Sequence, residues 1–112
     1  MIRIVFPTNE KMSYISSVET SFENSEYLTV LNVNGQNITA VETIQNPYIH
    51  SKDSMLKTCE ENKFKVLISP EGDCLPLKKL HKNGVHVYKT EEHKNVLQTF
   101  SDFVQDKLVR ID

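Results

Sequence analysis

One run, Phe64 to Leu75, constrains the fold of this 112-residue chain more than any other segment. It begins with the apolar residues of a buried strand, continues through a tight loop with Pro70 and Gly72, and becomes polar at Asp73. Asp is a preferred N-cap residue, so the pattern predicts a helix that starts at this aspartate. A buried strand that leads directly into a helix is typical of α/β folds, in which ligands bind where strands end and helices begin.

The rest of the chain continues this α/β pattern. Hydrophobic periodicity predicts further strands at residues 1–6, 27–33, 38–44 and 85–88. It also predicts a short helix at residues 53–62. Asn34-Gly35 separates two of the strands and indicates a β-hairpin. A last helix is expected to begin at Thr90 as its N-cap and to end near Arg110. Its core face would consist of Val96, Leu97, Phe100, Val104 and Leu108.

The expected element order is β-β-β-α-β-α-β-α. The hairpin pairs two strands antiparallel, and the later strand–helix units form right-handed parallel crossovers. We therefore predict a three-layer α/β fold with a five-stranded mixed sheet, order 3-2-1-4-5, and helices on both faces. This is the ribonuclease H-like architecture. Residues 1–112 are expected to form a single domain, since the length suits one hydrophobic core.

Charge and hydropathy exclude several function classes. The formal net charge is −2 and no basic run occurs, which argues against binding to nucleic acid or to a membrane surface. No segment approaches the ~20 apolar residues that a membrane-spanning helix needs. The apolar stretch Ile4-Val5-Phe6 is too short for a signal peptide, so we expect a cytoplasmic protein. Two cysteines are too few to indicate a disulfide framework, and we expect reduced thiols.

Cys74 is the first candidate for chemistry. Because it directly follows the expected N-cap, its thiol would meet unpaired backbone N–H groups and the positive end of the helix dipole. Both favour the thiolate, which binds metals or attacks electrophiles. The alternative is a small apolar residue packed under Pro70. The other cysteine, Cys59, shares the apolar face of the 53–62 helix with Met55 and is expected in the core.

Polar groups are expected to gather around this thiol. The first strand should lie beside the 64–69 strand and parallel to it, so the residues after both strands would share one edge of the sheet. The cluster would contain Thr8, Asn9, Ser69, Gly72 and Cys74. Hydroxyl, amide and backbone N–H groups suit an anionic ligand. The alternative is ordinary turn chemistry, which uses the same residue types.

His50 could reach the same edge as a metal ligand or a proton donor, and the alternative is a solvated loop histidine.

The sequence gives little support to a hydrolase function. Two-metal phosphoryl hydrolysis needs carboxylates around the metals, and the first strand, Ile2 to Phe6, carries none. There is no Gly-x-Ser-x-Gly motif, and Cys74 has no evident histidine partner. We therefore expect no enzymatic activity and no catalytic residues.

Over nearly its whole length the chain resembles the dinitrogenase iron-molybdenum cofactor biosynthesis proteins, which include NifX-like and small stand-alone members. The matching residues are Ile4-Val5-Phe6-Pro7-Thr8-Asn9, Ile15-Ser16-Ser17, Phe22, Tyr27-Leu28-Thr29-Val30, Asn46-Pro47, Val66-Leu67-Ile68, Gly72, 77–80 and Gly84-Val85-His86-Val87-Tyr88. The resemblance implies a ribonuclease H-like fold and non-enzymatic binding or carriage of an iron–sulfur-type or iron-molybdenum-type metallocluster or its precursor. It also implies a cluster donor or acceptor protein as the partner.

Two segments depart from the family pattern. Ser21-Phe22-Glu23-Asn24 stands where the family has His-Phe-Gly-Arg, and Ser69-Pro70-Glu71-Gly72 stands where it has Gly-Gly-x-Gly. The first change removes a histidine ligand, and the second adds an acid that would repel an anionic cluster. Soft ligation would then fall to Cys74, and one thiolate would hold a cluster transiently or with a second chain. The alternative is an interaction or regulatory module that has kept the fold and lost the cluster.

Overall fold

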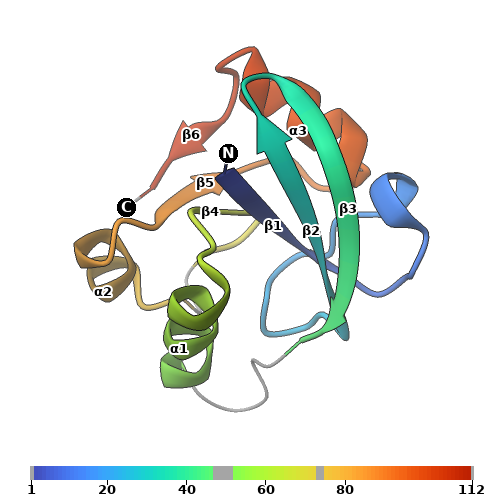
Figure 1. Cartoon of the computed structure of the whole chain (residues 1–112). Coiled ribbons are helices and arrows are strands. Elements are labelled where there is room, and N and C mark those ends of the chain that lie inside the picture. Colours follow the sequence, from blue (N-terminus) through green and yellow to red (C-terminus); the bar gives the residue numbers. More distant parts are fainter. Residues whose placement is uncertain (1, 47–51, 73–74, 112) are drawn as a thin grey trace.

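The computed structural model describes residues 2–46, 52–72 and 75–111. Figure 1 shows the elements of this part of the chain. In chain order they are β1 (Ile2–Thr8), η1 (Ser13–Ile15), β2 (Tyr27–Asn34), β3 (Asn37–Gln45), α1 (Lys52–Asn62), β4 (Val66–Ser69), α2 (Leu77–Lys82), β5 (His86–Lys89), α3 (Val96–Val104) and β6 (Val109–Arg110). None of the described helices is long and apolar enough to cross a membrane.

All the described strands belong to one mixed sheet, in the order β3-β2-β1-β4-β5-β6. The neighbours β1, β4 and β5 are parallel, whereas β2, β3 and β6 pair antiparallel. The predicted order 3-2-1-4-5 is confirmed for the first five strands. The predicted count of five is wrong, because Arg110 pairs with Tyr88 and adds a sixth strand at the edge. The ribonuclease H-like assignment stays a prediction.

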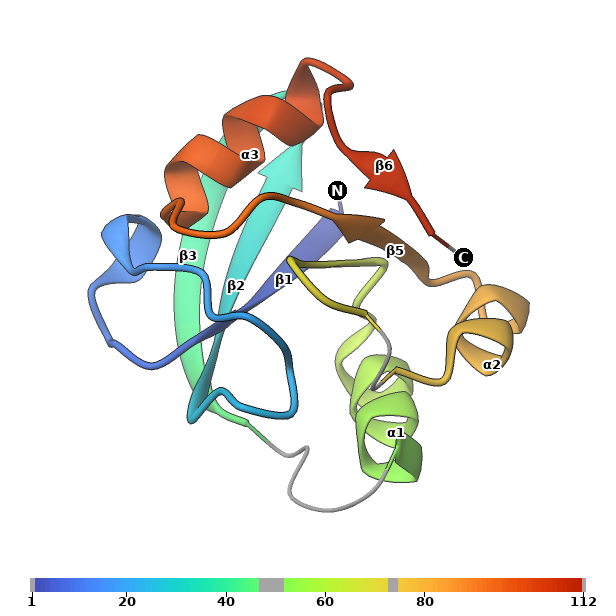
Figure 2. The ribbon, with the colours of Figure 1, turned by 180° about the vertical axis from the view of Figure 1, so that it is seen from behind.

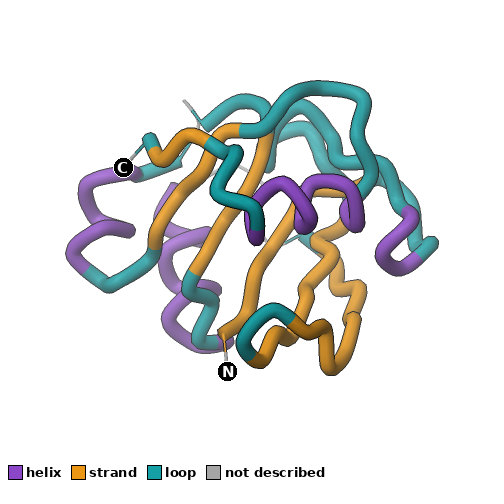
Figure 3. Tube along the Cα trace, turned by 90° about the horizontal axis from the view of Figure 1, so that it is seen from above, coloured by secondary structure: helices purple, strands orange, loops and turns teal. Residues whose placement is uncertain are grey.

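Helices cover both faces of the sheet, as Figures 1 and 2 show. Met55 and Cys59 of α1 and Leu80 of α2 pack in one hydrophobic cluster. Val96 and Phe100 of α3 pack in the other. Side chains alternate between the two faces of a strand, so Val5 of β1 lies in the first cluster and Ile4 and Phe6 lie in the second. The central strand β1 is therefore buried on both faces. Figures 1 and 2 show the resulting three layers, with the twisted sheet between the two groups of helices, and Figure 3 shows the strands lying side by side.

The two C-terminal helices begin later than the sequence predicts. α2 starts at Leu77 and its N-cap is Pro76, so the predicted start at Asp73 is wrong. α3 starts after Asn95, not after Thr90. The Asn95 side chain accepts a hydrogen bond from the Gln98 N–H, and the Gln98 side chain accepts one from the Asn95 N–H. This reciprocal capping box satisfies two backbone donors at once, which a single threonine cap cannot do.

The late start of α3 changes which residues face the core. Val96 and Phe100, four residues apart, lie on the buried side. Leu97 is 42% exposed, so its predicted place on the core face is wrong. The predicted hairpin is confirmed, but its turn lies one residue later in the sequence than the predicted Asn34-Gly35 turn. Its two central residues are Gly35 and Gln36, and the glycine has a φ of 65°, which a two-residue hairpin turn requires at this position.

Candidate functional site

The carboxyl ends of the parallel strands meet at one edge of the sheet, as predicted. Ile4 lies opposite Val66, and Val66 lies opposite His86, so the three strands end nearly level. Backbone hydrogen bonds then tie the loops that follow them. The Thr90 N–H donates to the Ser69 carbonyl over 3.1 Å, and the Glu71 N–H donates to the Thr20 carbonyl over 2.9 Å. The edge is therefore a connected set of loops rather than separate turns.

Thr8 and Asn9 use their side chains within the protein. Thr8 is fully buried, and its hydroxyl lies 3.0 Å from the hydroxyl of Thr29 on the neighbouring strand. The Asn9 amide nitrogen donates to Glu19 over 2.7 Å, and its oxygen accepts from the Glu26 N–H over 2.6 Å. These bonds hold the long β1–β2 connection against the sheet edge.

Ser69 and Gly72 shape the loop that follows β4. The Ser69 hydroxyl donates to the Glu71 carbonyl over 2.6 Å, which closes the loop on itself. Gly72 is buried, and a Cβ added to it would lie 2.4 Å from Cδ1 of Ile111. The C-terminal segment therefore packs directly on this loop, and a side chain at this position would have to displace the terminal methyl group of Ile111.

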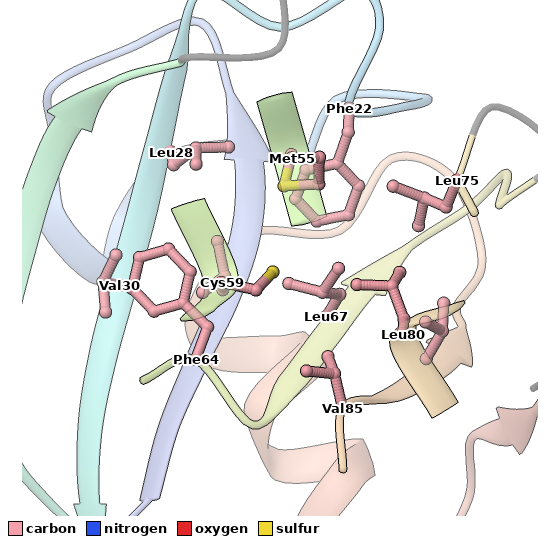
Figure 4. Close-up of a cluster of buried hydrophobic side chains, with 12 residues drawn as sticks. Phe22, Leu28, Val30, Met55, Cys59, Phe64, Leu67, Leu75, Leu80 and Val85 are labelled. Carbon is pink, nitrogen blue, oxygen red and sulfur yellow. The ribbon is translucent and has the colours of Figure 1, made fainter. Parts of the chain in front are cut away.

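The two predicted metal ligands, Cys74 and His50, lie outside the described residues. Cys59 is described, and its predicted place in the core is confirmed. It is 1% exposed and lies beside Met55 and Phe64 (Figure 4). Burial raises the pKa of its thiol to about 12, and the neighbouring Glu60 carboxylate adds to the shift. The thiol is thus protonated at neutral pH and closed off from solvent.

A cleft of about 460 Å³ lies between α2 and the C-terminal segment. It is lined by Leu77, Lys78, His81, Lys82 and Ile111. Because Ile111 also packs on Gly72, the cleft adjoins the loop after β4. Sequence reasoning missed it, since its far wall comes from the C-terminal segment, which was expected to be helical. The available signal was the pair of lysines four residues apart on α2, which share one side of a helix.

Among residues 2–46, 52–72 and 75–111, no three His, Cys, Asp or Glu side chains gather closely enough to hold a metal ion. The described cleft beside α2 is instead mainly apolar, and two exposed lysines border it.

Residues 1–106 match the family model described as dinitrogenase iron-molybdenum cofactor, and the chain belongs to this family. None of the curated proteins compared with the chain matches it significantly.

Solved structures show the same fold. The apo form of the orange protein from Desulfovibrio gigas superposes with a TM-score of 0.82 and 16% identity, over 99% of this chain and 93% of that one. A Thermotoga protein assigned as NifB has a TM-score of 0.76 and 21% identity, over 98% and 93% of the two chains. A Methanocaldococcus jannaschii protein assigned as a dinitrogenase has a TM-score of 0.71 and 14% identity, over 99% and 95%.

Proposed function

We propose that this protein binds and carries an iron–sulfur-type metallocluster, or a precursor of one, without catalysing a reaction. Membership of the iron-molybdenum cofactor family supports the class of cargo. The observation that carries the proposal is the cleft beside α2, because it has an apolar lining next to the loop of Gly72 and the exposed Lys78 and Lys82 border it.

The charges in the cleft suit an anionic cargo. Clusters built from sulfide and thiolate carry negative charge, and Lys78 and Lys82 place two cations at the cleft on a chain whose net charge is −2. Leu77 and Ile111 supply the apolar part of the lining.

Cys74 is proposed as the sulfur ligand, and His50 as a second ligand. The buried, protonated Cys59 is not available for this role. Thr8, Asn9, Ser69 and Gly72 are proposed as the cradle. Their part is to hold the loops in position, because the described hydrogen bonds of the first three are made within the protein.

The test is reconstitution without oxygen. The wild-type protein is incubated with iron and sulfide, desalted, and examined by visible absorption. We expect charge-transfer bands that disappear in Cys74→Ala and persist in Cys59→Ala. The second variant is the matched control, since it removes the other thiol of the chain. Far-ultraviolet circular dichroism establishes that both variants are folded.

A second pair of variants tests the cleft. Lys78→Gln combined with Lys82→Gln should lower the amount of cluster retained, and added salt should have a similar effect on the wild type. Lys57→Gln is the control, because Lys57 lies exposed on α1, outside the cleft. Colour that is unchanged in Cys74→Ala, or a wild-type protein that stays colourless, would contradict cluster carriage.

The second candidate function is a protein-interaction module. Met12, Tyr14 and Ile15 around η1 are 44–52% exposed, and Leu97 on the adjoining α3 is 42% exposed. Exposed apolar side chains that gather on one face are typical of interaction surfaces. A colourless wild-type protein after reconstitution would favour this function over the first.

A further inference from the structure

A second cleft, of about 370 Å³, lies on the α3 side of the molecule. It is bounded by the end of β5, the β5–α3 connection, α3 and the segment that leads from α3 to β6, and Figure 2 shows these elements together. Its polar lining consists of three lysines, two acids and a threonine: Lys89, Lys94, Lys107, Glu91, Asp102 and Thr90. The proposed cluster site uses none of these residues.

Thr90 has an unusual hydrogen-bonding state. Its side chain lines the cleft and the residue is 6% exposed, yet its hydroxyl oxygen has no hydrogen-bond partner. Among the buried side-chain nitrogen and oxygen atoms of the described residues, it is the only one in this state. An unpaired buried hydroxyl costs free energy, so a partner for it is to be expected from outside the chain.

The lysines of the cleft outnumber its acids, and one lysine pairs with both acids. Lys94 forms an ion pair with Asp102 and lies 3.8 Å from Glu91, so both acids of the cleft are engaged by one lysine. The hydrogen bond to Asp102 raises the pKa of Lys94, which keeps this lysine charged at neutral pH. Within the described part of the chain, no carboxylate lies at ion-pair distance from Lys89 or Lys107. Two unmatched lysines therefore line the same cleft as Thr90, the residue that carries the unpaired hydroxyl.

We propose that this cleft binds a tetrahedral oxyanion, either inorganic phosphate or the phosphate group of a small molecule, between Lys89, Lys107 and Thr90. Lysine binds phosphate as a point charge, and a threonine hydroxyl can donate to a phosphate oxygen. The volume falls at the lower end of the range for small-molecule sites, so the ligand is small. A cation is disfavoured, because both acids are already paired.

The experiment is a titration followed by amide chemical shifts in two-dimensional nuclear magnetic resonance. Inorganic phosphate and glycerol phosphate are added separately, with sodium chloride adjusted to keep the ionic strength constant. We expect saturable shifts at residues 89–94 and 107–109. Tighter binding of glycerol phosphate would identify a phosphorylated small molecule as the ligand, and equal binding would identify the free anion; both outcomes support the site.

Three variants localise the site. Thr90→Val, which keeps the shape and removes the hydroxyl, should weaken binding about tenfold while leaving the urea midpoint unchanged or raised. Lys107→Gln should also weaken binding about tenfold, and it keeps the test valid if the valine variant fails to fold. Lys57→Gln, on α1, should bind as the wild type does. Shifts that do not saturate, or a Lys57→Gln loss equal to that of Lys107→Gln, would overturn the proposal.

Discussion

Asn46 ties two distant parts of the chain together with one side-chain amide. Its nitrogen donates to the Phe22 carbonyl over 2.7 Å and to the Ser25 carbonyl and hydroxyl over 2.9 Å each. All three residues are buried, so water cannot replace these bonds. The end of β3 thereby fixes the 21–26 segment.

We expect Asn46→Ala to lower the free energy of unfolding by about 1–3 kcal/mol, because it leaves buried acceptors unpaired. Asn46→Asp should cost more at pH 7, since it turns a donor into a negative charge that faces those acceptors. Urea denaturation measures both. Asn83→Ala is the control, because Asn83 is exposed and its amide makes one local bond to the Lys79 carbonyl. A loss no larger than the control's would contradict this role.

The buried thiol of Cys59 makes stability depend on alkaline pH. Its pKa rises from 9.0 to about 12 on folding. Between these values the unfolded state has released the thiol proton and the folded state has not, so raising the pH favours unfolding. The contribution is fully present below pH 9 and is lost as the pH rises towards 12.

The prediction is tested by urea denaturation from pH 8 to 10.5 in the wild type and in Cys59→Ala. The wild type should lose stability more steeply above pH 9, with an excess slope that approaches about 1.4 kcal/mol per pH unit. The comparison removes the contribution of lysines, tyrosines and the other thiol, which the two proteins share. Parallel curves would show that the thiol titrates alike in both states.

At the scale of elements, the start of α3 rests on its capping box. We expect Asn95→Ala to lower the free energy of unfolding by about 1 kcal/mol, since the Gln98 N–H loses its acceptor. Thermal denaturation checks this value. Thr90→Val tests the position that the sequence favoured as the cap, and it should cause no comparable loss. The reverse result would place the helix start at Thr90.

The sequence predicts elements well where periodicity and burial agree, and it predicts their ends poorly. The hairpin and the parallel β1, β4 and β5 follow from apolar alternation and turn residues. The ends of α2 and α3 do not, because several residues compete as caps and tertiary hydrogen bonds decide among them. β6 is two residues long, so only its pairing with β5 reveals it.

The candidate edge follows the same rule. Its position could be predicted, because parallel strands bring the residues that follow them to one place. The partners of Asn9 could not, since Glu19 and Glu26 lie 10 and 17 residues away in an irregular connection. Both clefts depend on the C-terminal segment, whose strand the sequence does not indicate. Prediction therefore reached the location of the edge but not the shape of the surfaces around it.

At the scale of the whole molecule, the C-terminal segment couples the last strand to the loop after β4. The Ile111 N–H donates to the Val87 carbonyl over 2.9 Å, which continues the pairing of β6 with β5. The Ile111 side chain then packs on Gly72 and lines the cleft beside α2. Gly72 has no left-handed φ, so an alanine there is opposed by this contact alone.

A double-mutant cycle tests this coupling. Gly72→Ala should lower the free energy of unfolding by about 1 kcal/mol, because its Cβ would displace the terminal methyl group of Ile111. In the double variant with Ile111→Ala the overlap is gone, so the combined loss should fall short of the sum of the single losses by at least ~0.5 kcal/mol. Gly72→Ala with Val109→Ala is the control pair and should be additive, since Val109 is largely exposed on the same strand. Additivity in both pairs would show that the C-terminal segment lies on the loop without constraining it.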